Sequence, residues 1–200
     1  SLDIVPKMQG GSIDTEDHAR VLRKTAESII ELEVDFTRKI KNSFLFPVDK
    51  SLKVNGLKTL LEILGKEAGF NLSLNFTIPR FYLSHVIFED TGITLGRSLF
   101  MILEDKMKRQ GINGAGSNIQ KLGDMNKPIG VGISVEGRKS LCFTDFLVNY
   151  KGFKEYFIGK DALGLKSEDL DDFLDGFCTG LQGNMVIHVR KMVNQEVFWK

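Results

Sequence analysis

Alternating apolar and polar residues predict two half-buried strands in the first half of the chain. Apolar side chains alternate with acidic ones from Ile30 to Phe36, and the same period of two runs from Phe70 to Phe76. Because successive side chains of a strand point to opposite faces, each run has one apolar and one hydrated face. The segment from Lys39 to Phe46 is expected to pair with the first strand as its hairpin partner.

Three amphipathic helices are predicted from apolar residues that recur at helical spacing. The first ends before Gly69, since glycine tolerates the positive φ common at a helix C-terminus. The second covers about Glu89 to Arg109 and carries basic residues at its end, and the third follows a capping Ser167. The three apolar stripes are Leu57, Leu60, Leu61 and Leu64; Ile93, Phe100, Leu103 and Met107; and Leu170, Phe173, Leu174, Phe177 and Leu181.

The order of these elements predicts a duplicated α+β fold with two sheets, each covered by helices on one face. The first half is read as strand, strand, helix, strand, helix. The second half repeats this order with a hairpin over 129–147, a helix and a strand over 184–193. The sequence ends where its second long helix is expected. We therefore expect an N-terminal arm at 1–19, a first half-repeat at 20–110, a connecting loop at 111–128 and a second half-repeat at 129–200 that lacks its last helix.

Composition and charge exclude several classes of function. The 200 residues are 42% apolar and 26% charged, as in one ordinary globular domain. With 27 Lys and Arg against 26 Asp and Glu, the net charge of +1 gives no global basic field for nucleic acid. No apolar run reaches the roughly 18 residues of a membrane span. The sequence has no glycine-rich phosphate-binding loop, so a nucleotide cofactor is not expected.

The cysteines favour a reducing compartment. Cys142 and Cys178 are isolated from each other and form no C-x-x-C pair. The segment 1–11 contains no apolar core of a secretory signal. We expect a cytoplasmic protein that binds neither membranes nor nucleic acid.

The first candidate for chemistry is a histidine that precedes a pair of carboxylates. His85 lies four residues before Glu89, so a helix or tight turn would place the imidazole and the carboxylate on one face, where both could hold a divalent metal. The same spacing also suits a surface contact, and Glu89 and Asp90 can instead complement the positive end of a helix. The acidic residues at 169–172 are interpreted as a solvated helix face.

The segment from Glu89 to Gly96, preceded by His85, resembles the first metal motif of the imidazoleglycerol-phosphate dehydratase family, lyases of histidine biosynthesis. Arg23 to Ser28 resembles that family's R-x-T-x-E-T opening strand. The resemblance runs from about Arg23 to Lys200 in the family's order. Further matches are the strand start Gly69-Phe70, the helix end Gly111-Ile112, the turn Gly137-Arg138 and the strand Ile187-His188-Val189.

This resemblance implies a fold like the second domain of ribosomal protein S5, with two pseudo-repeated β-β-α-β-α halves, and assembly into a homo-oligomer. It implies two manganese ions between subunits, which stabilise the imidazolate that forms when water is eliminated. Matched position by position, the metal ligands are His85, Glu89 and His188. Glu27 and Glu89 take catalytic roles, and Arg138 binds the phosphorylated substrate.

The chain departs from the family at several ligand positions. Val86 stands at the second histidine of the first motif and Thr59 at another histidine. The second histidine pair falls at Phe198-Trp199 or, in another register, at Met192-Val193. With three histidines in the chain, about three or four of the family's eight ligands remain, whereas a divalent transition metal is held tightly by three or more protein ligands at one site.

From this loss of ligands we expect a divergent relative that is not a competent dimetal dehydratase and binds a small phosphorylated ligand or a single metal. Two alternatives stay open. One is an active, manganese-dependent dehydratase, a carbon–oxygen hydro-lyase. The other is a structural or assembly subunit without a ligand.

Overall fold

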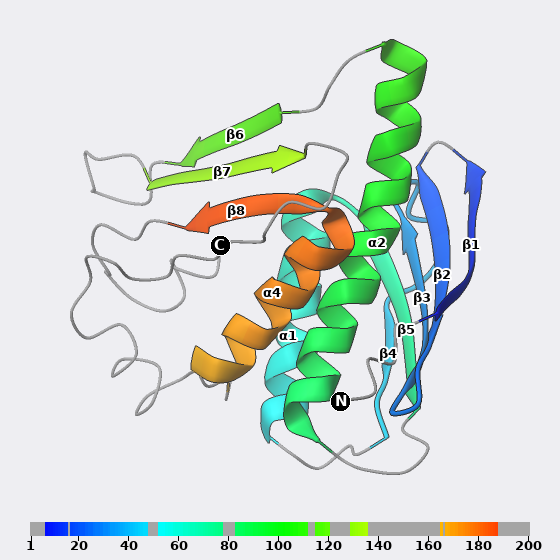
Figure 1. Cartoon of the computed structure of the whole chain (residues 1–200), viewed down its shortest axis with the longest axis vertical. Coiled ribbons are helices and arrows are strands. Elements are labelled where there is room, and N and C mark those ends of the chain that lie inside the picture. The colour runs from blue at the N-terminus through cyan, green and yellow to red at the C-terminus, as the bar shows by residue number, and fades with distance from the viewer. Residues whose placement is uncertain are drawn as a thin grey trace.

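The computed structural model describes residues 7–15, 17–47, 52–77, 83–111, 115–120, 129–135, 165 and 167–187. Helices lie between a five-stranded sheet and a three-stranded sheet (Figure 1). In chain order the elements are β1 (Lys7–Thr15), β2 (His18–Lys24), β3 (Ile29–Asp35), β4 (Ser43–Leu45), α1 (Leu52–Ala68), β5 (Asn71–Thr77), α2 (Ser84–Gln110), β6 (Ala115–Gln120), β7 (Ile129–Val135), α4 (Ser167–Leu181) and β8 (Gly183–Ile187).

The first sheet has the strand order β1-β2-β3-β5-β4. Its first three pairings are antiparallel, with Leu32 opposite Leu74, and β4 runs parallel to β5. The inward face carries the apolar residues of the predicted alternation, since Leu32 and Leu74 are buried while Glu31 and Glu33 on the other face are only half-buried. The strand predictions for β3 and β5 are confirmed.

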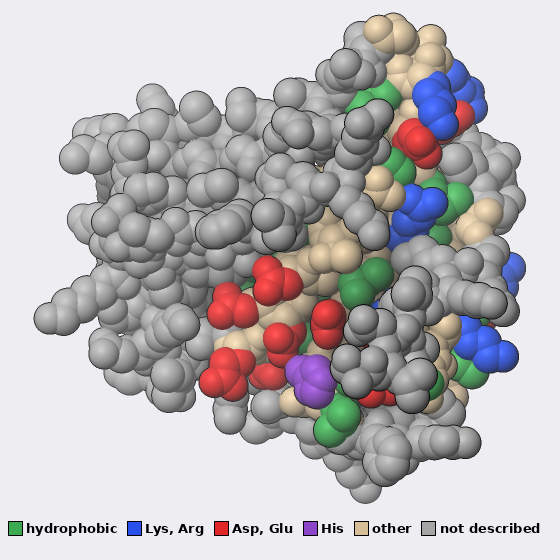
Figure 2. Space-filling model, viewed as in Figure 1, with side chains coloured by type: hydrophobic (Ala, Val, Ile, Leu, Met, Phe, Trp, Pro, Cys, Tyr) green, Lys and Arg blue, Asp and Glu red, His purple; other side chains and the backbone are tan. Residues whose placement is uncertain are grey.

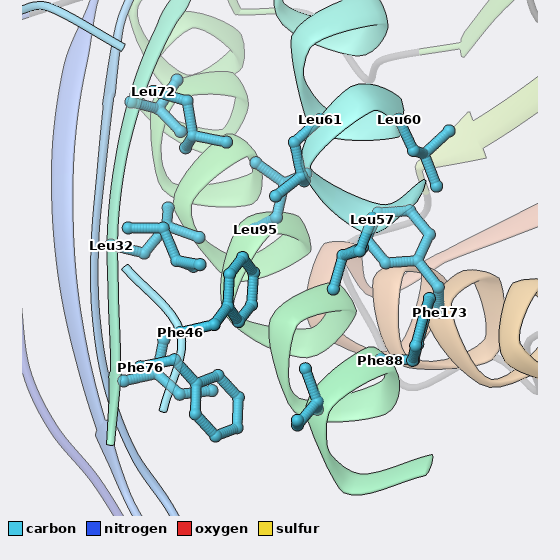
Figure 3. Close-up of a cluster of buried hydrophobic side chains, with 14 of the residues drawn as sticks. Leu32, Phe46, Leu57, Leu60, Leu61, Leu72, Phe76, Phe88, Leu95 and Phe173 are labelled. Atoms are coloured by element: carbon cyan, nitrogen blue, oxygen red, sulfur yellow. The ribbon is translucent and has the colours of Figure 1, made fainter. Parts of the chain in front are cut away.

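Helices α1 and α2 cover the inward face of this sheet. Figure 3 shows Leu32 and Leu72 of the sheet pointing toward Leu61 of α1 and Leu95 of α2, and all four side chains are buried. Full burial of such a side chain contributes about 1.5–3 kcal/mol. The first helix ends as predicted at Gly69, whose φ is +85°.

Helix α4 contacts α2 through two pairs of glycines. A Cβ added to Gly92 or Gly96 would lie 2.1 Å from a carbonyl oxygen of α4, and one added to Gly176 or Gly180 would lie 2.2 or 2.0 Å from a carbonyl oxygen of α2. No larger residue fits these positions unless the backbones separate. The contacts advance along both helices in the same direction, so the first turns of α4 lie beside the first turns of α2 (Figure 1).

The predicted hairpin between β3 and the segment 39–46 is wrong, because β4 pairs with β5 instead. The Asp35 carboxylate ends β3 by accepting hydrogen bonds from the backbone N–H groups of Thr37, Lys39 and Ile40 at 2.7, 2.7 and 3.1 Å. The turn leads the chain toward β5, where Asn42 Oδ1 accepts the N–H of Leu72 at 2.8 Å. Burial raises the pKa of Asp35, but these hydrogen bonds and that of the Thr37 hydroxyl outweigh it and hold the pKa at about 2.

Two strands lie where none was predicted. β1 falls in the range expected to be an N-terminal arm, so the sheet begins before Arg20, and β6 falls in the range expected to be a connecting loop. Both are edge strands of their sheets and contain glycine, so backbone pairing with one neighbour forms them without a strong apolar alternation.

The second sheet has the antiparallel order β6-β7-β8. The order β6, β7, α4, β8 follows that of β2, β3, α1, β5 in the first half, with β4 as an addition. The predicted hairpin partner of β7 at 140–147 is wrong, because β7 pairs with β6 on one side and β8 on the other. The segment 140–147 itself and the predicted continuation of β8 to Val193 lie outside the described residues. Within the described part of the chain, no helix combines the length and apolar character of a membrane span.

Candidate functional site

Helix α2 carries the histidine and glutamate of the predicted metal motif. It begins at Ser84 after an extended Leu83 and ends at Gly111, whose left-handed backbone places its N–H on the carbonyl of Met107. His85 and Glu89 are both exposed one turn apart, on one face as predicted. The helix starts earlier than the predicted Glu89, so Glu89 and Asp90 do not open it, and the stripe residue Leu103 is exposed rather than buried.

Carboxylates of α4 extend this site. Burial raises the pKa of Glu89, and the charges of Asp90 and Asp172 raise it further, while His85 and Arg23 lower it. Burial likewise raises the pKa of Asp172, which His85 lowers and the neighbouring α4 carboxylates raise. Figure 2 shows acidic side chains gathered around a histidine over the first turns of these helices. Asp172, in the acidic segment that the sequence indicates as a solvated face, thus lies near His85, whereas Asp169 of that segment is buried.

Asp90 lies beneath this surface in a buried polar cluster. It is 6% exposed, and its Oδ1 lies 2.8 Å from Nη1 of Arg23, which is 4% exposed. The buried Ser28 hydroxyl donates a hydrogen bond to Oδ2. Burial raises the pKa of Asp90, Ser28 and Arg23 lower it, and the nearby charge of Glu27 raises it.

Glu27 lies on a turn rather than on the predicted opening strand, because β2 ends at Lys24. Thr25 Oγ1 accepts the N–H groups of Glu27 and Ser28 at 3.1 and 2.9 Å, and the Thr25 N–H donates to the Ser28 carbonyl at 2.8 Å. These local hydrogen bonds compete with strand pairing and close the turn. The Glu27 side chain is exposed.

Two positions that the resemblance matches to metal-binding histidines have structural roles in this chain. Val86 is 5% exposed and belongs to the hydrophobic core. The Thr59 hydroxyl donates to the carbonyl of Asn55, one turn earlier in α1, at 3.1 Å. Within the described ranges, no three His, Cys, Asp or Glu side chains are grouped to hold a metal ion.

The remaining predicted site residues lie outside the described ranges. These are His188 and Arg138, together with both candidate registers for the second histidine pair, at Met192-Val193 and Phe198-Trp199.

Sequence reasoning did not identify Arg23, Ser28 or Asp172 as part of the site. A signal for Arg23 exists, since it follows Ala19 and Val21 on the inward face of β2, where a buried arginine requires a partner. On the exposed face of α2, the His85 imidazole and the Glu89 carboxylate lie one turn apart, and the Asp172 carboxylate of α4 is near both. Such a surface can bind one cation.

Comparison with known proteins finds relatives that are imidazoleglycerol-phosphate dehydratases. The imidazoleglycerol-phosphate dehydratase of Deinococcus radiodurans is 27% identical over 179 residues, which cover 89% of this chain and 80% of the relative. That of Deinococcus deserti is 28% identical over 178 residues, with the same coverage. No family model matches the chain.

Solved structures agree on the fold. The imidazoleglycerol-phosphate dehydratase of Staphylococcus aureus superposes with a TM-score of 0.57 at 17% identity, over 91% of this chain and 89% of its own. IGPD of Pyrococcus furiosus in complex with (S)-C348 superposes with a TM-score of 0.54 at 22% identity, over 83% of this chain and 77% of its own. The α+β fold is therefore that of these enzymes.

Proposed function

We propose that the chain is a divergent member of the imidazoleglycerol-phosphate dehydratase family that binds a single divalent metal ion or a small phosphorylated ligand and is not a competent dimetal dehydratase. One observation carries this proposal. Val86 is packed in the core, whereas His85 and Glu89 are exposed one turn apart. The helix face thus offers one imidazole where the family motif has two.

His85 and Glu89 supply the nitrogen and oxygen donors that manganese and zinc accept. When bound, a divalent ion would act as a Lewis acid on the ligand beside it. The carboxylate of Asp172 adds negative charge near His85 and favours a cation there. Two donors hold an ion weakly, so the others come from water, from His188 as the resemblance implies, or from another copy of the chain.

Metal stoichiometry and turnover test the proposal. Titration with Mn²⁺, followed by electron paramagnetic resonance, is expected to show no more than one ion per chain, and imidazoleglycerol phosphate is expected to remain unconverted. His85→Ala and Glu89→Gln should each weaken Mn²⁺ binding about tenfold or more, because each removes a donor.

A second histidine–glutamate pair provides the matched control. His18 Nε2 and Glu33 Oε1 lie 2.5 Å apart on the sheet, so His18→Ala and Glu33→Gln remove the same chemical groups at another place. Neither should change Mn²⁺ binding. Two ions per chain together with turnover would establish the active dehydratase instead, and no binding of Mn²⁺ or of imidazoleglycerol phosphate would favour a structural subunit.

Self-association follows from the same premise, since two donors from one helix are too few to hold an ion tightly. We expect a homo-oligomer in which a second copy completes the site around His85 and Glu89. Light scattering with and without Mn²⁺ measures the mass, and a monomer under both conditions contradicts this part of the proposal.

A further inference from the structure

A buried polar contact connects β2, the turn after it and helix α2. Arg23 of β2 and Ser28 of the turn bind the two carboxylate oxygens of Asp90, which lies on α2 next to Glu89. All three side chains are buried. Residues far apart in the sequence are therefore fixed to each other at a single carboxylate.

The turn that Ser28 belongs to is rigid in itself. Thr25 accepts two backbone N–H groups within it and donates its own to the Ser28 carbonyl. Because these bonds hold Glu27 and Ser28 in one unit, the contact from Ser28 to Asp90 fixes the whole turn on α2. Glu27 is then close enough to Asp90 for their charges to interact, and Asp90 interacts in the same way with Glu89.

Stability alone is a weak reason for this cluster. Removing Arg23 and Asp90 from water is costly, and apolar residues of similar volume are often equally or more stabilising in such places. A hydrogen-bonded carboxylate has a fixed geometry that apolar packing lacks. The cluster is therefore suited to setting the position of the turn.

We propose that Asp90 is a positioning residue that, through Ser28, holds the Thr25–Ser28 turn on α2 and keeps Glu27 close to Asp90, next to the ligand-binding surface of His85 and Glu89. This inference deepens the proposed function and rests on it. Because Asp90 itself is buried, it acts through Glu27 rather than on the ligand directly.

Hydrogen exchange tests the position of the turn without any ligand. Ser28→Ala removes the bond to Asp90 but leaves the backbone bonds to Thr25, so the amide protons of residues 27 and 28 should exchange about tenfold faster or more. Ser28→Thr keeps a hydroxyl and should restore slow exchange. Ser98→Ala is the matched control, since Ser98 is an equally buried serine of α2 that donates to the Thr94 carbonyl.

Ligand binding tests whether the turn acts through Glu27. With Mn²⁺ present, Ser28→Ala and Glu27→Gln should each weaken binding of imidazoleglycerol phosphate by about tenfold, and the double variant should be no weaker than either single one. Additive losses would mean that Ser28 acts independently of Glu27 and would overturn the inference.

The two proposals fail in different ways. If neither Mn²⁺ nor imidazoleglycerol phosphate binds the wild-type chain, the proposed function is wrong, and hydrogen exchange still decides whether Asp90 holds the turn. Unchanged exchange in Ser28→Ala, with Mn²⁺ still bound, overturns the positioning role alone.

Discussion

Two histidine–glutamate pairs in the described part of the chain differ in their surroundings. On the outward face of the sheet, His18 and Glu33 of adjacent strands lie 2.5 Å apart, and the nearby Glu31 is paired with Arg20. On α2, His85 and Glu89 are one turn apart and surrounded by further carboxylates. The same two side chains thus make a closed pair in one region and an open, negatively charged surface in the other. Unbalanced charge, rather than residue type, distinguishes the candidate site.

The largest expected effect comes from the ion pair beneath the open surface. Arg23→Met should lower the free energy of unfolding by about 3 kcal/mol or more, because it leaves the Asp90 carboxylate buried without its cation. Arg20→Met, which breaks the exposed pair with Glu31 beside the closed site, should cost less than about 1 kcal/mol. Urea unfolding measures both, and equal losses would contradict the contrast.

The contact of α4 with α2 gives the next largest effect. Gly176→Ala places a methyl carbon 2.2 Å from the carbonyl oxygen of Glu89, so the helices must separate at the open site. We expect a loss of about 1–3 kcal/mol, with Thr179→Ala, an exposed residue of the same helix, as control. If thermal unfolding of the glycine variant matches the wild type, the helices are not in backbone contact.

Lowering the pH should destabilise the fold through Asp35, which lies opposite His18 of the closed pair in the sheet. The folded-state pKa of Asp35 is about 2, below the ordinary aspartate value of 3.8. Its stabilisation is therefore complete above pH 3.8 and is lost as the pH falls from there through about 2, with a total of about 2 kcal/mol. Asp35→Asn should remove this part of the acid dependence, and an unchanged slope of unfolding free energy against pH would contradict the assignment.

Much of the fold follows from the sequence because apolar periodicity reports burial. It predicted β3, α1, β5 and α4, whose side chains face a common core. It missed β1 and β6 because edge strands depend on backbone pairing, and it misplaced the partner of β4 because parallel pairing is a contact between distant segments. Local patterns carry no information on such contacts.

The candidate site, like the fold, was predicted from the sequence only where local spacing determines it. Spacing alone placed His85 and Glu89 on one helix face, as the structure has them. The bond of Asp90 to Ser28 and the approach of Asp172 to His85 join separate elements, so no local pattern could predict them. Resemblance brought Glu27 into consideration, but only the turn geometry shows how its backbone is held.

The smallest expected effect concerns the negative charge of Asp172, which is present near His85 and Glu89 and distinguishes this pair from the closed one. Asp172→Asn removes a carboxylate that raises the pKa of Glu89, so the pKa of Glu89 should fall. Carbon-detected NMR of the glutamate carboxyl groups measures this pKa, and Asp171→Asn on the same helix is the matched control. Because the open surface would lose part of its negative charge, Mn²⁺ binding should weaken slightly in the same variant. An unchanged pKa of Glu89 would mean that α4 does not contribute to the open site, and the contrast between the pairs would then rest on α2 alone.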